Sequence, residues 1–266
     1  MRLSQIHPSL YYLRVRQKRI ARHLSDLLST KKFARDKSIN NLPYKCKAHK
    51  SLLRRKLGAS DPSLQEGKVI NLQIARQAID GVLINPNETF SFWKLLGKTT
   101  SEKGYVEGLQ LSRGEVKTGV GGGLCQLANL LYWMVLHSPL EIAERHHHSF
   151  DPFPDDRRVL PFGSGASVFY NYVGLRFYNP TDRMFQFRVW LTEDYLQGAI
   201  YTDQEWNYSY HITEKKHQFL QQNGKNYRKN EIWRNIFDKC TGNLVTEELV
   251  IKNFSEVKYS LSDLHN

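Results

Sequence analysis

The stretch at residues 119–139, GVGGGLCQLANLLYWMVLHSP, places three consecutive glycines before a cysteine and a long apolar run. Apolar side chains then recur at helical spacing until Pro139 ends the pattern, at Leu124, Leu127, Leu131 and Met134 or Val135. The sequence therefore predicts a helix that carries Cys125 in its first turn, directly after a glycine turn.

The position of Cys125 suggests chemistry. The first turn of a helix presents unpaired backbone N–H groups and the positive end of the helix dipole, and both favour a thiolate over a thiol. Glycines let the backbone turn sharply and approach a substrate, and their N–H groups can form an oxyanion cradle. We therefore expect Cys125 to be an activated nucleophile, and the candidate substrate-binding residues are Gly121, Gly122, Gly123 and Gln126.

A base for this nucleophile is expected in the segment ERHHHS, residues 144–149. The residues from Leu140 onward alternate like a strand, which would put His146 and His148 on the same side as Glu144. Either histidine is a candidate base, and Glu144 is the candidate residue that orients it. The expected catalytic group is thus Cys125 with His148, His146 and Glu144.

Each of these features also has a structural interpretation. A glycine turn before a helix is often a packing turn, and a lone cysteine is often a small buried side chain. His-x-His with a distant cysteine is a workable zinc set, but the chain shows no clear fourth ligand. We therefore predict no metal and no other cofactor. Cys46, Cys125 and Cys240 are widely and irregularly spaced, which predicts no disulfide framework and agrees with a reducing compartment.

The positive charge of the chain lies at its N-terminal end. The chain carries a formal net charge of +12, and its first 60 residues hold 16 Lys and Arg against 2 Asp. Within them, residues 8–28 repeat apolar side chains at near-helical period with cationic residues between, at Leu13, Ile20, Leu24 and Leu27. This pattern predicts either an interfacial helix on an anionic membrane surface or acidic partner, or an ordinary helix packed on its own domain. Nucleic acid is not an expected partner, because no recognised nucleic-acid motif accompanies the charge.

Three regions follow from these patterns. Residues 1–60 read as a basic helical N-terminal extension, with a second short basic helix after Pro43. Residues 61–205 read as the core domain, with a capping box at Ser63 and Glu66 and a hairpin formed by segments 167–179 and 183–201. Residues 206–266 read as a polar C-terminal extension with short strand-like pieces.

The predicted fold class is α+β, with the Cys-bearing helix packed on an antiparallel sheet. No run approaches the roughly 18 apolar residues of a membrane span, and no signal peptide is evident. We therefore expect a cytoplasmic protein, or one held peripherally on the inner membrane face.

Several segments together resemble one family. They are residues 119–165, from GVGGGLCQ through ERHHHSF to PFGSG, residues 85–108, NPNETFSFWKLLGKTTSEKGYVEG, and residues 51–58, SLLRRKLG. Over about Pro43 to Tyr201 the chain resembles the VanW family, specifically its short stand-alone form, an accessory protein of B-type vancomycin resistance clusters.

The resemblance implies a role in peptidoglycan metabolism. VanW domains in larger secreted envelope proteins have been linked to L,D-transpeptidase activity, in which a cysteine joins peptidoglycan stems through an acyl-enzyme. The matching nucleophile would be Cys125, and the histidines of the family pattern ERHxHS would be His146 and His148. Longer members of the family tend to carry an acidic residue where this chain has Gly165, so either Glu144 orients the base or no residue does.

Two functional hypotheses remain open at this stage. The first is a cysteine acyltransferase or peptidase acting on a peptidoglycan stem peptide or precursor. The second is a non-catalytic accessory or binding protein of cell-envelope metabolism. Cross-linking takes place outside the membrane, so a protein without an export signal would act on a nucleotide- or lipid-linked precursor.

Overall fold

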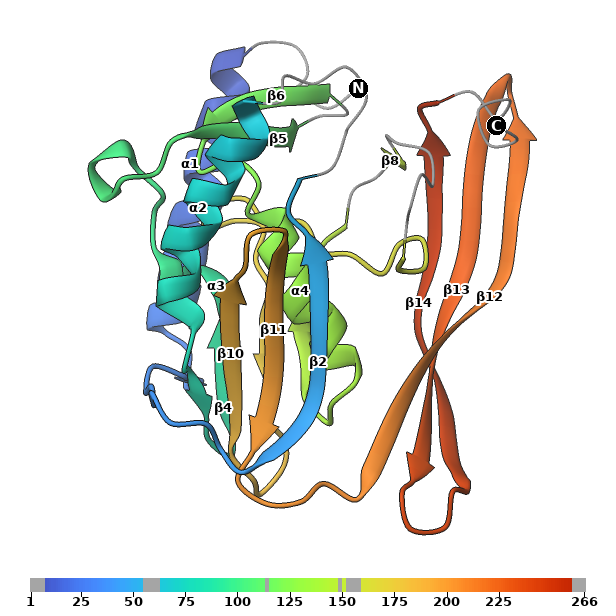
Figure 1. The fold of residues 1–266 in the computed structure, drawn as a ribbon. Helices are drawn as coiled ribbons and strands as arrows, with labels where there is room; N and C mark the ends of the chain where they lie inside the picture. The colour runs from blue at the N-terminus through green and yellow to red at the C-terminus, as the bar shows by residue number, and fades with distance from the viewer. Residues whose placement is uncertain (1–7, 55–62, 113–114, 148–149, 152–158, 260–266) are drawn as a thin grey trace.

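The computed structural model describes residues 8–54, 63–112, 115–147, 150–151 and 159–259. It is an α+β fold, as the sequence predicts (Figure 1). The described helices are α1 (Pro8–Leu27), α2 (Ser63–Ile79), α3 (Phe92–Leu96), the short 3₁₀ helix η2 (Ser101–Lys103) and α4 (Cys125–Leu136). Within the described segments, no helix is both long enough and apolar enough to cross a membrane.

The described strands form three larger sheets and one hairpin. The central sheet is antiparallel, in the order β2 (Tyr44–Leu52), β11 (Tyr195–Thr202), β10 (Phe185–Leu191) and β3 (Leu83–Ile84). A second sheet has the order β1 (Lys32–Phe33), β4 (Glu88–Ser91), β9 (Arg176–Tyr178) and β7 (Glu141–Glu144). The two-stranded hairpin is β5 (Glu107–Ser112) with β6 (Glu115–Val120).

Helix α4 forms the centre of the molecule. Its side chains are buried on nearly every side, which is the pattern of a helix enclosed by its own protein. It packs on β2 and β11 of the central sheet, and these strands lie in front of α4 in Figure 1. Gly198 of β11 leaves room there for Met134 and Leu130 of α4. Burial of each such leucine contributes about 1.5–3 kcal/mol. The predicted Cys-bearing helix on an antiparallel sheet is therefore confirmed.

A cluster of phenylalanines joins the central sheet to the second sheet. The rings of Phe90 on β4 and Phe177 on β9 stack with centroids 5.3 Å apart, and Phe187 on β10 lies 5.2 Å from Phe90. All three side chains are buried. Because aromatic pairs add to the energy of area burial, this cluster fixes the two sheets against each other.

Two predictions of local structure were wrong. The basic segment after Pro43 is not a helix, because residues 44–52 form β2, which pairs along its length with β11. Segments 167–179 and 183–201 do not form a hairpin with each other, because β9 joins the second sheet while β10 and β11 form the hairpin within the later segment. In both cases pairing with other strands of the sheet outweighed the structural preference of the local sequence.

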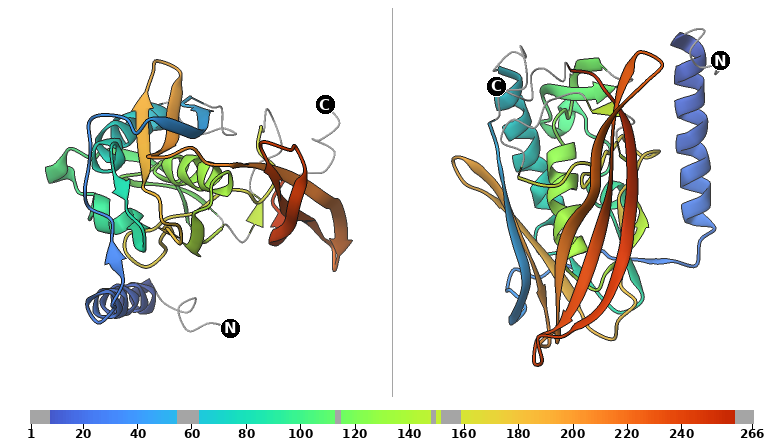
Figure 2. Two further views of the ribbon diagram at one scale, coloured as in Figure 1. Left: turned by 90° about the horizontal axis from the view of Figure 1, so that it is seen from below. Right: turned by 90° about the vertical axis from the view of Figure 1, so that its right-hand side faces the viewer.

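The C-terminal region is a sheet of long strands rather than a set of short pieces. Its order is β12 (Tyr208–Gln222), β13 (Lys225–Asp238), β14 (Leu244–Val257) and β8 (Phe150–Asp151). Figure 2 shows this sheet at one side of the molecule, while α1 stands at another edge and joins the rest through β1. The helical pattern predicted for residues 8–28 is confirmed by α1, Pro8–Leu27.

Candidate functional site

The glycine turn before α4 is shaped by close backbone packing. A Cβ atom at Gly122 would lie 2.1 Å from the carbonyl oxygen of Gly108 on β5, so only glycine fits there. Gly123 has φ +93°, in the left-handed region that favours glycine. The turn is also held by α2, because Asn71 Nδ2 donates a hydrogen bond to the Gly122 carbonyl at 2.9 Å.

Two of the three glycine amides are already used within the fold. The N–H of Gly121 donates to the Val106 carbonyl at 3.0 Å, and the N–H of Gly122 donates to the Gly119 carbonyl at 3.0 Å. These two donors are therefore not free to hold an oxyanion in this conformation, contrary to the cradle expected from the sequence. The role that the structure does support for the turn is steric, since it brings the backbone close to the start of α4.

Cys125 is the first residue of α4 and is partly buried. Its sulfur lies 4.0 Å from the carbonyl oxygen of Val168. Burial raises the pKa of the Cys125 thiol, and this effect outweighs the hydrogen bonds that would lower it. Desolvation therefore acts against the lowered pKa that a helix N-terminus alone would give Cys125.

The structure brings Glu144 and His146 together. Strand β7 ends at Glu144, and the Nε2 atom of His146 lies 2.9 Å from Glu144 Oε1. The third expected residue, His148, lies outside the described residues. No hydrogen bond or ion pair among the described residues joins His146 to Cys125, so this histidine is paired with its acid but not with the expected nucleophile.

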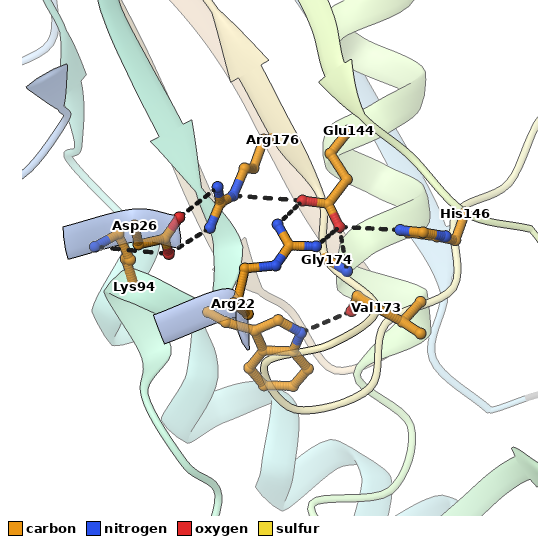
Figure 3. Close-up of polar contacts among 9 residues, drawn as sticks. Arg22, Asp26, Lys94, Glu144, His146, Val173, Gly174 and Arg176 are labelled. Atoms are coloured by element: carbon orange, nitrogen blue, oxygen red, sulfur yellow. Dashed lines mark hydrogen bonds and ion pairs between the residues drawn. The ribbon is translucent and has the colours of Figure 1, made fainter. Parts of the chain in front are cut away.

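Glu144 is the centre of an ion-pair cluster (Figure 3). Arg22 of α1 donates to both carboxylate oxygens of Glu144, and Arg176 of β9 lies 3.4 Å from it. The Gly174 N–H donates to the same carboxylate at 3.0 Å. Burial acts to raise the pKa of Glu144, but the hydrogen bonds and charge of its partners prevail and lower the pKa to about 2. Glu144 is therefore an anchoring carboxylate as well as a partner of His146.

The cluster continues into a second acid–base pair. Asp26 of α1 accepts two hydrogen bonds from Arg176, at 2.8 and 2.7 Å, and Lys94 of α3 lies 3.7 Å from it. No pattern in the sequence indicated that Arg22, Arg176, Asp26 or Lys94 belongs to a site. They lie far from Glu144 in the sequence and carry no motif, so only the fold brings them together.

The turn around Gly165 is held by side chains from α4 and from the segment after β7. The Asn129 side chain on α4 accepts a hydrogen bond from the Ala166 N–H at 2.6 Å. Arg145 donates to the Gly165 carbonyl at 2.8 Å. A Cβ at Gly165 would lie 2.9 Å from Asn129 Oδ1, so the amide of Asn129 occupies the space that a side chain would need.

A cavity of about 530 Å³ lies beside Cys125. Of the candidate residues, Cys125, Gln126, Gly121 and Gly123 line it, whereas Gly122, Glu144 and His146 do not. The Gln126 side chain is fixed on β2, where its Nε2 donates to Ser51 Oγ at 2.9 Å and to the Leu52 carbonyl at 2.8 Å. The volume falls in the range of small-molecule and cofactor sites.

The walls of the cavity are aromatic and basic. The aromatic lining residues are Tyr11, Tyr12, Trp93, Phe169, Tyr170 and Tyr172. The ionisable lining side chains, apart from tyrosine and cysteine, are Arg19, Lys68 and Lys98, and no carboxylate is among the described lining residues. Lys68 is buried and donates to Gln65 Oε1 at 2.7 Å and to the Leu53 carbonyl. Such walls suit a ligand that carries negative charge.

Helix α1 forms one wall of this cavity. Arg19 donates to the Tyr170 carbonyl at 3.0 Å, and its guanidinium lies 5.2 Å from the centre of the Tyr170 ring. The hydroxyls of Tyr11 and Tyr172 lie 3.4 Å apart. The helix predicted as a basic extension therefore contributes directly to the site.

No metal centre is evident within the described part of the chain, which does not include His148. There, no three His, Cys, Asp or Glu side chains gather as metal ligands would. Cys46 and Cys240 are free thiols, as is Cys125.

Comparison with known proteins places the chain in a family. Residues 67–201 match the family described as VanW like protein. The chain is 30% identical over 262 residues to "Vancomycin B-type resistance protein VanW" of Enterococcus faecalis (strain ATCC 700802 / V583), covering 98% of this chain and 95% of that protein. It is 36% identical over 112 residues to "Uncharacterized protein YoaR" of Bacillus subtilis (strain 168), covering 41% of this chain and 34% of that protein. No solved structure matches. The long match to the enterococcal protein and the family match across the cavity and α4 show that this chain belongs to the VanW family.

Proposed function

We propose that this protein binds a peptidoglycan stem peptide, or a precursor that carries one, in the cavity beside Cys125. The observation that carries the proposal is the cavity itself, whose ionisable walls include Arg19, Lys68 and Lys98 and no described carboxylate. A stem peptide carries carboxylates, and a nucleotide- or lipid-linked precursor adds phosphates. The relative that matches nearly the whole chain is named as a vancomycin resistance protein, which supports a cell-wall peptide as the ligand.

The surroundings of Cys125 favour binding over catalysis. Its pKa is raised by burial, and its described polar neighbour is a backbone carbonyl rather than a base. His146 is held by Glu144, and Glu144 is held by two arginines. A non-catalytic accessory role requires none of these groups to move.

Cysteine-dependent acyl transfer is a second candidate, because Cys125 lines the same cavity. In that reaction the Cys125 thiolate attacks a peptide carbonyl, a thioester forms, and the protonated amine leaves. A second amine or water then takes the acyl group and restores the thiol. The reaction needs a base within reach of the sulfur, and His146 or His148 is the candidate once the ligand-bound arrangement is reached.

Calorimetric titration with a synthetic stem peptide tests the binding proposal. We expect Lys98→Gln, which removes an exposed basic group from the cavity wall, to weaken binding about tenfold, as loss of a charge-assisted hydrogen bond does. The control Lys225→Gln changes an exposed lysine of β13 that does not line the cavity, and it should bind like the wild type. Absence of binding by the wild type, or equal affinity for all three proteins, would refute the proposal.

Intact-protein mass spectrometry separates the two candidates. If the protein is a binding module, Cys125→Ala retains affinity for the peptide and the wild type forms no covalent adduct. If acyl transfer occurs, the wild type shows a thioester adduct of the peptide minus its leaving amine, and Cys125→Ala shows none.

A further inference from the structure

Helix α1 is oriented in an unusual way for a helix of a globular protein. The face that contacts the rest of the molecule is mainly polar or aromatic, and consists of Tyr11, Val15, Arg19, Arg22 and Asp26. These positions follow one side of the helix at about 100° per residue. Surface helices normally turn their apolar stripe toward the core, whereas α1 turns mainly polar and aromatic side chains toward it.

The apolar stripe of α1 faces outward instead. Its members are Leu10, Leu13, Ile20, Leu24 and Leu27, and their exposed fractions range from 41% to 67%. At helical spacing this stripe lies roughly opposite the inner face and runs along most of a helix about 30 Å long. Figure 2 shows α1 at the edge of the molecule, where its outer side faces away from the other described elements. The sequence prediction that these residues share a face is therefore confirmed, but that face is not used to pack α1 on the core.

The exposed charges of α1 are all basic. Arg14 and Lys18 border the stripe on one side, and Arg16 borders it on the other. The acidic residue of the helix, Asp26, is turned inward and paired with Arg176. The outer surface of α1 is thus apolar along its middle and basic along both edges.

We infer that the outer face of α1 docks on an anionic lipid surface. The leucines and the isoleucine would enter the boundary between headgroups and acyl chains, and the bordering arginines and lysine would meet the anionic headgroups. The helix is held to the protein by polar contacts on its inner face, so docking leaves those contacts intact. The cavity beside Cys125 then lies directly behind the membrane-bound helix, because Tyr11, Val15 and Arg19 form one of its walls.

A second copy of the chain is the alternative occupant, and the charges disfavour it. If two outer faces met, the borders of both helices would bring like charges together, since no acidic side chain lies on that face. An anionic surface neutralises the same borders. The polar Gln17 in the middle of the stripe is tolerated at a hydrated interface between headgroups and water.

Flotation with lipid vesicles tests the inference, using the full chain. The probes are vesicles of phosphatidylcholine alone and vesicles with about 30% phosphatidylglycerol, at low salt and at about 0.5 M salt. We expect binding to the anionic vesicles at low salt, with loss of most binding at high salt. The variant Leu13→Ser/Leu24→Ser should bind at least about tenfold more weakly, because two apolar anchors are lost.

A matched control tests whether vesicle binding depends on the apolar face of α1 or on any exposed apolar side chains. Leu244→Ser/Val245→Ser removes two similarly exposed side chains from β14, and it should bind vesicles like the wild type. Light scattering after gel filtration reports the oligomeric state of each protein. Equal vesicle binding by all three proteins, no binding at low salt, or a dimer lost in Leu13→Ser/Leu24→Ser without vesicle binding would each overturn the inference. Because no arm uses the peptide ligand, failure here is independent of the proposed function.

Discussion

At the scale of single residues, Glu144 shows how a correct local prediction can miss a wider role. The motif ERHHHS indicated that Glu144 and His146 act together, and their side chains are hydrogen bonded at 2.9 Å. The motif contained no sign of Arg22 or Arg176, which reach the same carboxylate from α1 and β9. Such partners could not be predicted, because the sequence separation hides a proximity that only the folded chain creates.

Glu144→Gln should reveal the anchoring role through its dependence on pH. At pH 7 we expect a loss of about 3 kcal/mol in the free energy of unfolding, because two partly buried arginines lose their shared carboxylate. The lowered pKa of Glu144, about 2, means that this stabilisation is fully present above the carboxyl group's ordinary pKa. It is lost as the pH falls from about 5 to 2, where the two proteins should converge.

Urea denaturation of both proteins at several pH values measures this difference. Glu247→Gln is the control, because its pair with Lys215 is solvent-exposed and should contribute less than about 1 kcal/mol. A constant difference between wild type and Glu144→Gln from pH 7 to pH 2 would show that lost packing, not lost charge, is the cause.

Gly122 tests whether the glycine turn is a packing device. Gly122→Ala should cost about 3 kcal/mol or more, because the new methyl group would meet the Gly108 backbone at 2.1 Å. Gly242→Ala is the comparison, since Gly242 has φ +72° but open space around it, and it should cost about 1 kcal/mol. Thermal unfolding of the two variants measures both values, and equal losses would contradict the packing explanation.

At the scale of elements, periodicity predicted helices better than strands. The apolar run after Cys125 predicted α4, and Pro139 marked its end, because a long helical pattern is carried by the segment alone. Strand β2 was mistaken for a helix because its many lysines conceal an alternating segment that is stabilised by pairing with β11, about 150 residues later. The signal missed in the C-terminal region was Asn223-Gly224, whose positive φ values, 51° and 72°, form the tight turn between β12 and β13.

The polar attachment of α1 predicts how this helix behaves in solution. Hydrogen exchange should be faster in α1 than in α4, because α1 is held by a few partly buried ion pairs and α4 by an apolar core. Asp26→Asn should increase exchange in α1 by roughly tenfold, because it weakens the bond to Arg176. Asp182→Asn, an exposed change far from α1, is the control. Equal protection of α1 and α4 would show that α1 is part of the core.

At the scale of the whole molecule, the site is assembled from distant parts of the sequence. The glycine turn, Cys125 and Gln126 were predictable because they lie in one short motif, and they line the cavity apart from Gly122. Other lining residues come from α1 and from the loop that carries Tyr170 and Tyr172. Local patterns identified the lining residues around Cys125, whereas the contributions from distant segments and the basic character of the cavity depended on the fold.

The basic residues of the N-terminal region lie on both the inner and the outer side of α1. The basic N-terminal region supplies Arg19 to the cavity and Arg22 to the Glu144 cluster, and it leaves a basic, apolar surface on the outside of α1. One helix thus faces the cavity beside Cys125 on one side and solvent on the other. This arrangement links the binding proposal to the lipid-docking inference without making either depend on the other.

The most direct test is the rate of Cys125 alkylation by iodoacetamide against pH, in a Cys46→Ser/Cys240→Ser protein, with and without a stem peptide. The structure predicts slow alkylation with a pKa above the usual value of about 8.5, and slower alkylation still when the peptide fills the cavity. His146→Ala should not alter the profile, because no described contact joins His146 to Cys125. A thiolate that titrates well below about 8.5, shifts with His146→Ala and reacts at the same rate when peptide is present would contradict the account.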